Sequence, residues 1–263
     1  MKATNRSWLV VILLLILCPA MLHAQDPFEI QVYEYDTVPK GMWNLETHLN
    51  YIGSGTRSFD TTVAPTNNQS HFTFELTRGL TDHFELAGYL VLGRRVGEGL
   101  EYAGWRVRPR VSLPRSWHLP IDVSLSGEVG FPRDLYEENS VTLEVRPILE
   151  KRLGRCQLDF NPVIGRALRG PGQHDGWDFE PAARIAYQWN ARLDLSLEYY
   201  GALGPVGNLL PGHEQVHQFY PGADINLSEN VVWNVGVGVA ATESGNQLVY
   251  KTRIGILFGH KHH

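Results

Sequence analysis

Beyond residue 40, hydrophobic and polar residues alternate in one short segment after another. In residues 43–51, Trp43, Leu45, Leu49 and Tyr51 share one face, while Glu46 and other polar residues share the opposite face. A period of two residues predicts a β-strand with one apolar side. Eleven similar segments follow, at residues 72–76, 84–92, 105–113, 121–131, 141–149, 156–164, 179–189, 193–199, 217–227, 231–239 and 248–258. The pattern predicts an all-β fold of about twelve strands.

The joins between these segments differ in length in a regular way. Short joins are predicted at residues 79–82, 153–155, 190–192 and 228–230, with a longer one at 114–120. Long joins, polar or rich in Gly and Pro, are predicted at 52–71, 93–104, 132–140, 166–178 and 202–216. Strand alternation alone also fits a soluble barrel or a sandwich. Many of the segments have the length of a tilted strand that crosses a bilayer, and alternating short turns and long loops are typical of outer-membrane barrels.

Aromatic residues on the apolar face, near the strand ends, favour the membrane interpretation. They lie toward the short turns (Trp43, Phe84, Trp189, Trp233, Phe258) and toward the long loops (Tyr51, Trp105, Phe219, Tyr250), as two interfacial aromatic girdles would. A soluble barrel of twelve strands would also enclose a lumen too wide for side chains to fill. We therefore expect a transmembrane, antiparallel, up-and-down β-barrel over residues 41–258. An even strand number places both chain ends on the periplasmic side.

The chain ends carry separate predictions. Residues 1–24 have a basic start, an apolar stretch and a small residue, Ala24, before the expected cleavage site, which predicts a secretory signal peptide; a retained anchor is the alternative. Residues 25–40 are expected to form a periplasmic N-terminal segment. Phe28, Ile30 and Val32 alternate there, and Glu34 interrupts the pattern. This segment could dock at the barrel mouth, enter the lumen as a small plug, or contact a periplasmic partner. Residues 259–263 form a C-terminal tail.

Composition narrows the possible functions. The 263 residues carry 23 Lys and Arg against 28 Asp and Glu, a net charge of −5, whereas a nucleic-acid-binding protein needs a clustered basic excess. We expect no nucleic-acid partner. Beyond residue 24 no apolar run is long enough for a spanning helix. Without the signal peptide only Cys156 remains, so no intramolecular disulfide can form.

Several stretches resemble a known family. FEIQVYEYDTVPKG (28–41), GLTDHFELAGYL (79–90), LEVRPILEKRLGR (143–155), FEPAARIAY (179–187) and TRIGILF (252–258) are similar to bacterial outer-membrane β-barrel proteins of porin-like or transporter-like type, near the MetA-pathway phenol-degradation family. The resemblance covers about residues 27–258. It implies the barrel fold and an outer-membrane location, and it carries over no catalytic or binding residue. The last strand also resembles the closing strand that barrel-assembly machinery recognises.

The polar face of the strands is heavily charged. The alternate strand positions that make up this face hold thirteen acidic and seven basic residues. The acidic residues are Glu46, Glu75, Glu85, Asp122, Glu128, Glu144, Glu150, Asp159, Asp178, Glu180, Asp194, Glu198 and Asp224, and the basic residues are Arg106, Arg108, Arg110, Arg146, Arg184, Lys251 and Arg253. An open lumen with this excess would mildly favour cations. Alternatively, the charges pair and fill the bore. Hairpin pairing predicts that Arg106 lies near Glu128, and Glu128 near Glu144. The candidate lumen and selectivity residues are Arg106, Arg108, Arg110, Glu128, Glu144 and Arg146.

Other chemistry has weaker support. His174 with Asp175 and Asp178, and His213 with Glu214, lie in predicted outer loops, where a His–carboxylate pair could activate water. No Ser or Cys lies in a nucleophile motif beside them, so we expect no enzyme; a hydrolase of outer-membrane lipid is a third hypothesis. The terminal His260, His262 and His263 form a weak metal-ligand set. The leading hypothesis is a passive channel or transporter-like pore for small solutes, without cofactors or metal, embedded in outer-membrane lipids. The main alternative is a non-conducting structural or surface-interaction barrel.

Overall fold

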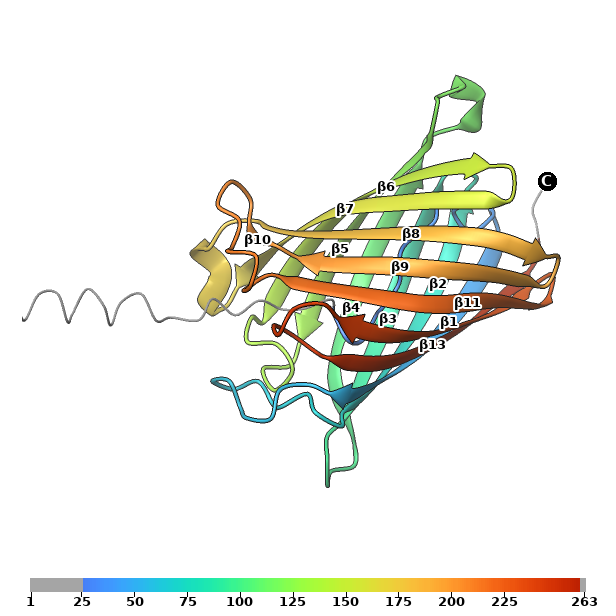
Figure 1. The fold of residues 1–263 in the computed structure, drawn as a ribbon. Coiled ribbons are helices and arrows are strands. Elements are labelled where there is room, and N and C mark those ends of the chain that lie inside the picture. Colours follow the sequence, from blue (N-terminus) through green and yellow to red (C-terminus); the bar gives the residue numbers. More distant parts are fainter. Residues whose placement is uncertain (1–25, 261–263) are drawn as a thin grey trace, which may run out of the picture.

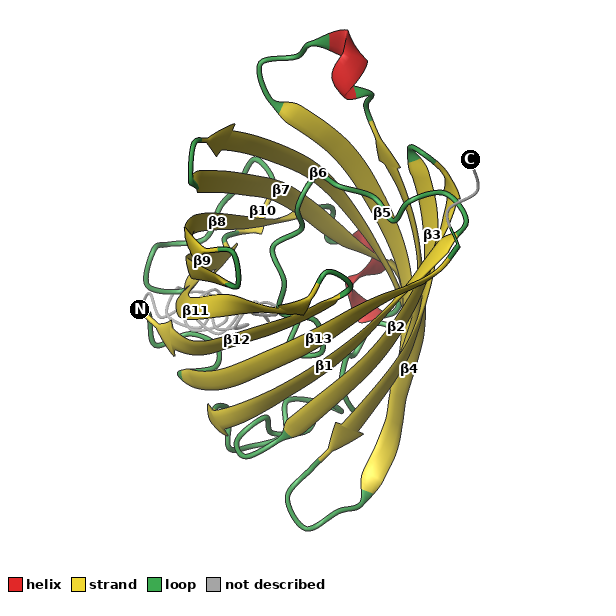
Figure 2. Ribbon diagram, turned by 90° about the vertical axis from the view of Figure 1, so that its right-hand side faces the viewer, coloured by secondary structure: helices red, strands yellow, loops and turns green. Residues whose placement is uncertain are grey.

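A computed structural model describes residues 26–260 and shows one antiparallel β-barrel (Figures 1 and 2). The predicted signal peptide, residues 1–24, lies outside the described residues. Thirteen strands and two short 3-10 helices make up the fold: β1 (Met42–Ser54), β2 (Ser70–Thr81), β3 (Phe84–Arg94), β4 (Leu100–Ser112), η1 (Arg115–Trp117), β5 (Asp122–Pro132), β6 (Val141–Leu153), β7 (Cys156–Arg169), η2 (Pro171–His174), β8 (Asp178–Asn190), β9 (Leu193–Ala202), β10 (Gly204–Pro205), β11 (Val216–Ser228), β12 (Val231–Ala240) and β13 (Leu248–Gly259).

Twelve of these strands close into a ring. Each pairs with its neighbours along the chain, β1 pairs with β13, and β8 pairs with β9, while β10 adds two residues to the edge of β8. All twelve strands predicted from the alternation are present. Because every one of the twelve has a partner on both sides, the barrel leaves no open edge, which is the condition for placing β-structure in lipid.

One predicted turn is wrong. Residues 79–82 were expected to form the join after the second strand, but Gly79 lies inside β2 and the chain turns at Asp82–His83. The backbone of the N-terminal segment explains this: a Cβ on Gly79 would lie 2.3 Å from the carbonyl oxygen of Val38, and the Gly79 carbonyl accepts a hydrogen bond from the Gly41 amide. Glycine is needed here for a close approach of two backbones rather than for a turn.

The outer surface of the barrel is apolar. Leucine, isoleucine, valine and aromatic side chains at alternate strand positions point outward, including the girdle residues Tyr51, Trp105, Trp189, Trp233 and Phe258. Among residues 26–260, no helix is long and apolar enough to cross a membrane. The closed ring with its apolar exterior is the architecture of an outer-membrane barrel, with the short turns on the periplasmic side.

Residues 25–40 were expected to form a periplasmic segment, but the described part of this segment does not lie in the periplasm. Its described part enters the barrel at the short-turn end, where it joins β1, and runs through the lumen toward the long-loop end (Figure 2). The plug placement, one of three left open, is therefore the observed one. The described start of the chain also lies away from the periplasmic side, because the Pro27 carbonyl accepts a hydrogen bond from Asn50, which lies nearer the long-loop end of β1 than its periplasmic end. The N-terminal chain end, which was predicted to be periplasmic, lies outside the described residues. We call residues 26–41 the luminal segment.

Candidate functional site

The lumen is the candidate site, and the luminal segment is its main occupant. The segment forms no regular secondary structure between Phe28 and Pro39. Backbone amides and carbonyls that leave water need hydrogen-bond partners, so an extended chain inside a barrel depends on the surrounding wall. Wall side chains donate hydrogen bonds to four backbone carbonyls: Asn50 to Pro27, Thr73 to Phe28, Lys251 to Ile30 and Arg146 to Gln31. Asn161 accepts from the amide of Tyr33 and donates to its carbonyl. The carboxylates of Glu150 and Glu85 accept from the amides of Tyr35 and Val38.

Tyr33 is the centre of the polar contacts. Three guanidinium groups approach the face of its ring: Arg146 at 4.5 Å, Arg108 at 4.8 Å and Arg110 at 5.5 Å from the ring centroid. Its hydroxyl contacts Glu29 and lies 3.0 Å from the hydroxyl of Tyr89. A cation over a tyrosine face is attracted by the ring quadrupole, and more strongly when both groups are desolvated. Tyr33 therefore holds the segment at mid-lumen and fills the space between the arginines.

The segment also has apolar contacts. Ile30 and Val32 pack with buried residues of five strands: Ile52, Ala182, Tyr200, Tyr220 and Val249. Nearer the long loops, Phe28 packs with Ala87, Tyr89, Val91, Ala103 and Tyr136. The alternating residues Phe28, Ile30 and Val32 are therefore buried, whereas the alternating apolar residues of the strands face outward. This stretch forms no ladder with a strand. Glu34, which interrupts the pattern, pairs with Arg184 of β8 at 3.0 Å.

All six candidate residues named from the sequence lie in the lumen. Arg106 pairs with Glu128 at 3.1 Å, as expected from the hairpin, although its direct partner in the β4–β5 register is Gly130. Arg106 also pairs with Asp26. Glu128 faces Glu144 across the β5–β6 pair, and Arg146 binds Glu144 at 2.7 Å.

The two remaining candidates also contact charged or segment groups. Arg108 binds Glu75 and Glu85. Arg110 donates to the carbonyls of Glu34 and Asp36. These contacts explain the arginine ladder on β4: its members hold the luminal segment as well as the neighbouring carboxylates.

Two further ion-pair centres did not stand out from the sequence. Lys251 is buried on β13 and pairs with Glu198 of β9 at 2.5 Å. Arg184 binds Asp159, Asp224 and Glu34 together. Parity had placed all the wall members of these groups in the lumen. It could not pair Arg184 with Asp224 or Lys251 with Glu198, because these partners lie on strands that are not neighbours in the ring.

The two ends of the luminal segment lie in different surroundings. At the periplasmic end, Asp36 contacts Arg115 at 3.1 Å and Arg152 at 3.7 Å, and all three side chains are exposed. At the loop end, Tyr136 covers Phe28 and donates a hydrogen bond to Glu101 at 3.1 Å. Burial and this hydrogen bond raise the pKa of Tyr136 to about 12. The hydroxyl therefore stays protonated and continues to donate at neutral pH.

Two cavities remain around the segment. The inner cavity, of about 430 Å³, lies toward the short turns; the outer cavity, of about 210 Å³, lies toward the long loops. They have no lining residue in common. Ile30 and Val32 line neither cavity and pack against the wall instead, so neither of these two cavities runs through the whole barrel.

Among the described residues, His213 is not placed to activate the nearby serine. His213 lies 3.4 Å from Glu214 in an exposed loop. The nearby Ser244 donates its hydroxyl hydrogen to the backbone carbonyl of His213 rather than to the imidazole. A serine activated by this histidine would need the opposite arrangement, with the ring nitrogen accepting the hydroxyl proton.

Comparison with known proteins supports the fold. No family model and no curated protein matches the sequence, so the resemblance to the MetA-pathway family gains no support from sequence. Solved structures do match. The KdgM porin aligns with a TM-score of 0.55 and 8% identity over 82% of this chain and 99% of that one. The COG4313 outer membrane channel from Pseudomonas putida F1 aligns with a TM-score of 0.54 and 12% identity, over 88% and 100%. The NanC porin aligns with a TM-score of 0.53 and 7% identity, over 83% of this chain and 99% of that one.

Proposed function

We propose that this outer-membrane barrel is a passive channel for small solutes that the luminal segment holds closed in the described conformation. The observation that carries the proposal is the pair of cavities toward the two ends of one lumen, with the luminal segment lining both of them. The segment is held largely through hydrogen bonds and ion pairs from the wall. Water can replace such contacts at a modest net cost per bond, which makes a displaced segment an attainable state.

The charges that line the two cavities support a preference for cations. The outer cavity is lined by six acidic residues, Asp26, Glu128, Glu137, Glu144, Asp178 and Glu180, and two basic ones, Arg106 and Arg166. The inner cavity is closer to balance, with eight acidic and six basic residues. Rings of carboxylates favour cations in pores. In this proposal Glu128 and Glu144 set selectivity at the outer end, and Arg106, Arg108, Arg110 and Arg146 hold the segment.

The experiment is conductance across a planar bilayer under a salt gradient. It compares the full chain with a variant that lacks residues 27–38 and with Tyr33→Ala, which keeps the segment but removes its central ring. We expect small or rare steps for the full chain, larger steps for Tyr33→Ala and the largest for the deletion, with a reversal potential of cationic sign. Glu128→Gln together with Glu144→Gln should reduce the cation preference. A gel shift between boiled and unboiled samples checks that each barrel is folded.

A second function is favoured by the same occupied lumen. If the segment is a permanent part of the core, the barrel is a non-conducting structural or surface-interaction protein. A folded deletion variant that shows no conductance would support this function and reject the channel.

A further inference from the structure

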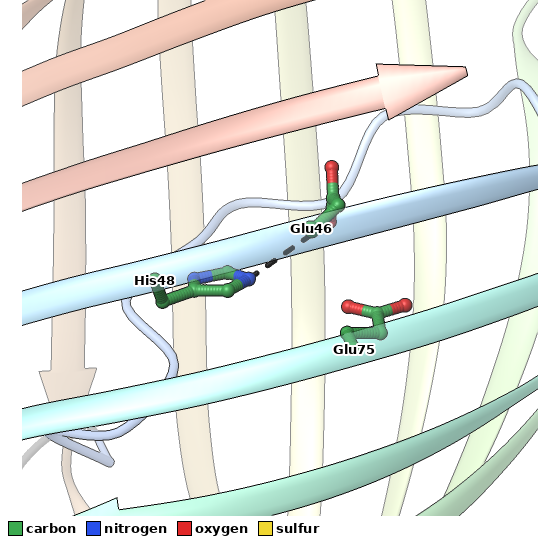
Figure 3. A group of neighbouring side chains, drawn as sticks. All are labelled: Glu46, His48 and Glu75. Carbon is green, nitrogen blue, oxygen red and sulfur yellow. Dashed lines mark ion pairs between the residues drawn. The ribbon is translucent and has the colours of Figure 1, made fainter. Parts of the chain in front are cut away.

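Three luminal side chains on β1 and β2 converge on one point and are not used by the luminal segment. Glu46 and His48 occupy successive inward positions of β1, and Glu75 lies opposite Glu46 in the β1–β2 register. One ligand atom from each residue lies within 4.8 Å of the other two. Figure 3 shows the side chains of Glu46 and His48 on β1 and that of Glu75 on the neighbouring strand, β2. All three residues are buried.

Two of the converging atoms have no partner of their own. His48 is 1% exposed, and its Nε2 has no hydrogen-bond partner; it lies 3.9 Å from Oε2 of Glu46. Glu75 is also 1% exposed, and its Oε2 has no hydrogen-bond partner either. Leaving a buried polar atom unpaired costs about 1–3 kcal/mol. Two such atoms in one buried cluster would each gain a partner if an ion bound there.

The other carboxylate oxygens are already used, which fixes both groups in place. Arg253 binds Oε1 of Glu46, and Arg108 binds Oε1 of Glu75, which also accepts the hydroxyl hydrogen of Thr77. Partners of this kind orient ligands in metal sites. The same two guanidinium groups offset the charge of the carboxylates. An ion held by charge alone, such as Mg²⁺, gains little here, whereas an ion that also bonds well to imidazole gains more.

We infer that Glu46, His48 and Glu75 form a binding site for a divalent transition-metal ion such as Zn²⁺. With bonds of about 2.0–2.2 Å, the ligands of a tetrahedral ion lie about 3.3–3.6 Å apart, so small side-chain rotations bring the three atoms to bonding distance. Three protein ligands leave one position for water or a solute. The inference goes beyond the channel function, because the ligands belong to the barrel wall and bind metal whether or not the pore conducts.

The ion can reach this site from the periplasmic end. Glu46 and Glu75 line the inner cavity, together with Gly154, Arg155, Glu229 and Asn230 of the short turns. His48 lies behind them and does not line the cavity. An ion arriving from the turns therefore meets the carboxylates first and the imidazole last.

The test is calorimetric titration of the EDTA-treated, detergent-solubilised full chain with Zn²⁺, repeated with Co²⁺ and its visible spectrum. We expect one ion per chain, a Co²⁺ absorption spectrum typical of a site with nitrogen and oxygen ligands, and an affinity lowered at least about tenfold in His48→Ala and in Glu75→Gln. The matched control is Glu198→Gln, which removes a buried luminal carboxylate outside the cluster and leaves Zn²⁺ affinity unchanged.

The C-terminal histidines are the competing site, so a second control replaces His260, His262 and His263 with alanine in the full chain. Binding that persists in this variant and falls in His48→Ala supports the luminal site. Binding that disappears in the tail variant, or that is equal in wild type, His48→Ala and Glu75→Gln, overturns it. The absence of stoichiometric binding to a barrel that passes the gel-shift check overturns it too.

Discussion

Leu197 and Glu198 are neighbours on β9, yet they lie in opposite environments. Leu197 points outward with 48% of its surface exposed, while Glu198 is 3% exposed and pairs with Lys251 in the lumen. The same contrast recurs around the ring, for example between Ile185 and Arg184 on β8. An outward side chain needs only to be apolar, because lipid adapts to its shape. An inward side chain needs a particular partner, since the lumen contains fixed charges.

The largest effect on stability is expected from an inward charge. In Arg108→Met, Glu75 and Glu85 lose a shared buried guanidinium. Removing one member of a buried ion pair leaves an uncompensated charge and costs about 3–5 kcal/mol. We expect the free energy of unfolding, measured with urea in lipid vesicles, to fall by about that amount. The control is Arg95→Met, which breaks the more exposed pair with Glu101 and should lower the free energy of unfolding far less, because water competes for exposed ion pairs. Equal losses in the two variants would contradict the contrast between lumen and surface.

The next largest loss of stability is expected from a charged substitution on the outer, lipid-facing side of the barrel. Ile185 lies near the middle of β8 and is 56% exposed. An arginine there would face the hydrocarbon, at a cost of about 2–4 kcal/mol near the bilayer midplane. Ile185→Leu is the matched control and should be close to neutral. The same urea titration in vesicles measures both. If Ile185→Arg unfolds at the wild-type urea concentration, this face of β8 does not contact lipid.

The smallest loss of stability is expected from a substitution at the periplasmic end of the luminal segment. Asp36 is exposed and contacts Arg115 and Arg152, which are also exposed. Water competes for such pairs, so Asp36→Asn should lower the free energy of unfolding by only about 0–1 kcal/mol. A loss as large as that of Arg108→Met would show that the periplasmic end of the segment is a main anchor, and that stability does not follow burial in this lumen.

The sequence predicts the barrel well because its signal is local. Alternation within a strand, as in residues 43–51, sets which side faces lipid without knowledge of any other strand. Adjacent hairpins also fix near neighbours, which is why the pairing of Arg106 with Glu128 could be predicted. Pairs such as Glu198 with Lys251, or Asn161 with Tyr33, depend on ring closure and on the path of the luminal segment. Neither is encoded in a local pattern.

The luminal segment itself illustrates this limit. Phe28, Ile30 and Val32 gave a strand-like signal that Glu34 interrupted, and an unpaired stretch of this kind fits several locations. Its location in the lumen is determined by hydrogen bonds from at least seven wall residues, which lie on six different strands. The position of Gly79 was also predicted wrongly, because its close contact comes from a distant part of the chain. It was interpreted as part of a turn, because the backbone that approaches it comes from residues 38–39.

Surface labelling of intact cells tests whether the luminal segment passes through the barrel. An epitope tag is inserted between Asp26 and Pro27, with reference tags in the β1–β2 loop and in the β11–β12 turn. The account predicts that antibody binds intact cells carrying the tag at Asp26 or in the β1–β2 loop. Cells with the β11–β12 tag should bind only after the outer membrane is permeabilised. A tag at Asp26 that behaves like the β11–β12 tag, on a barrel that still shows the gel shift, would contradict the account.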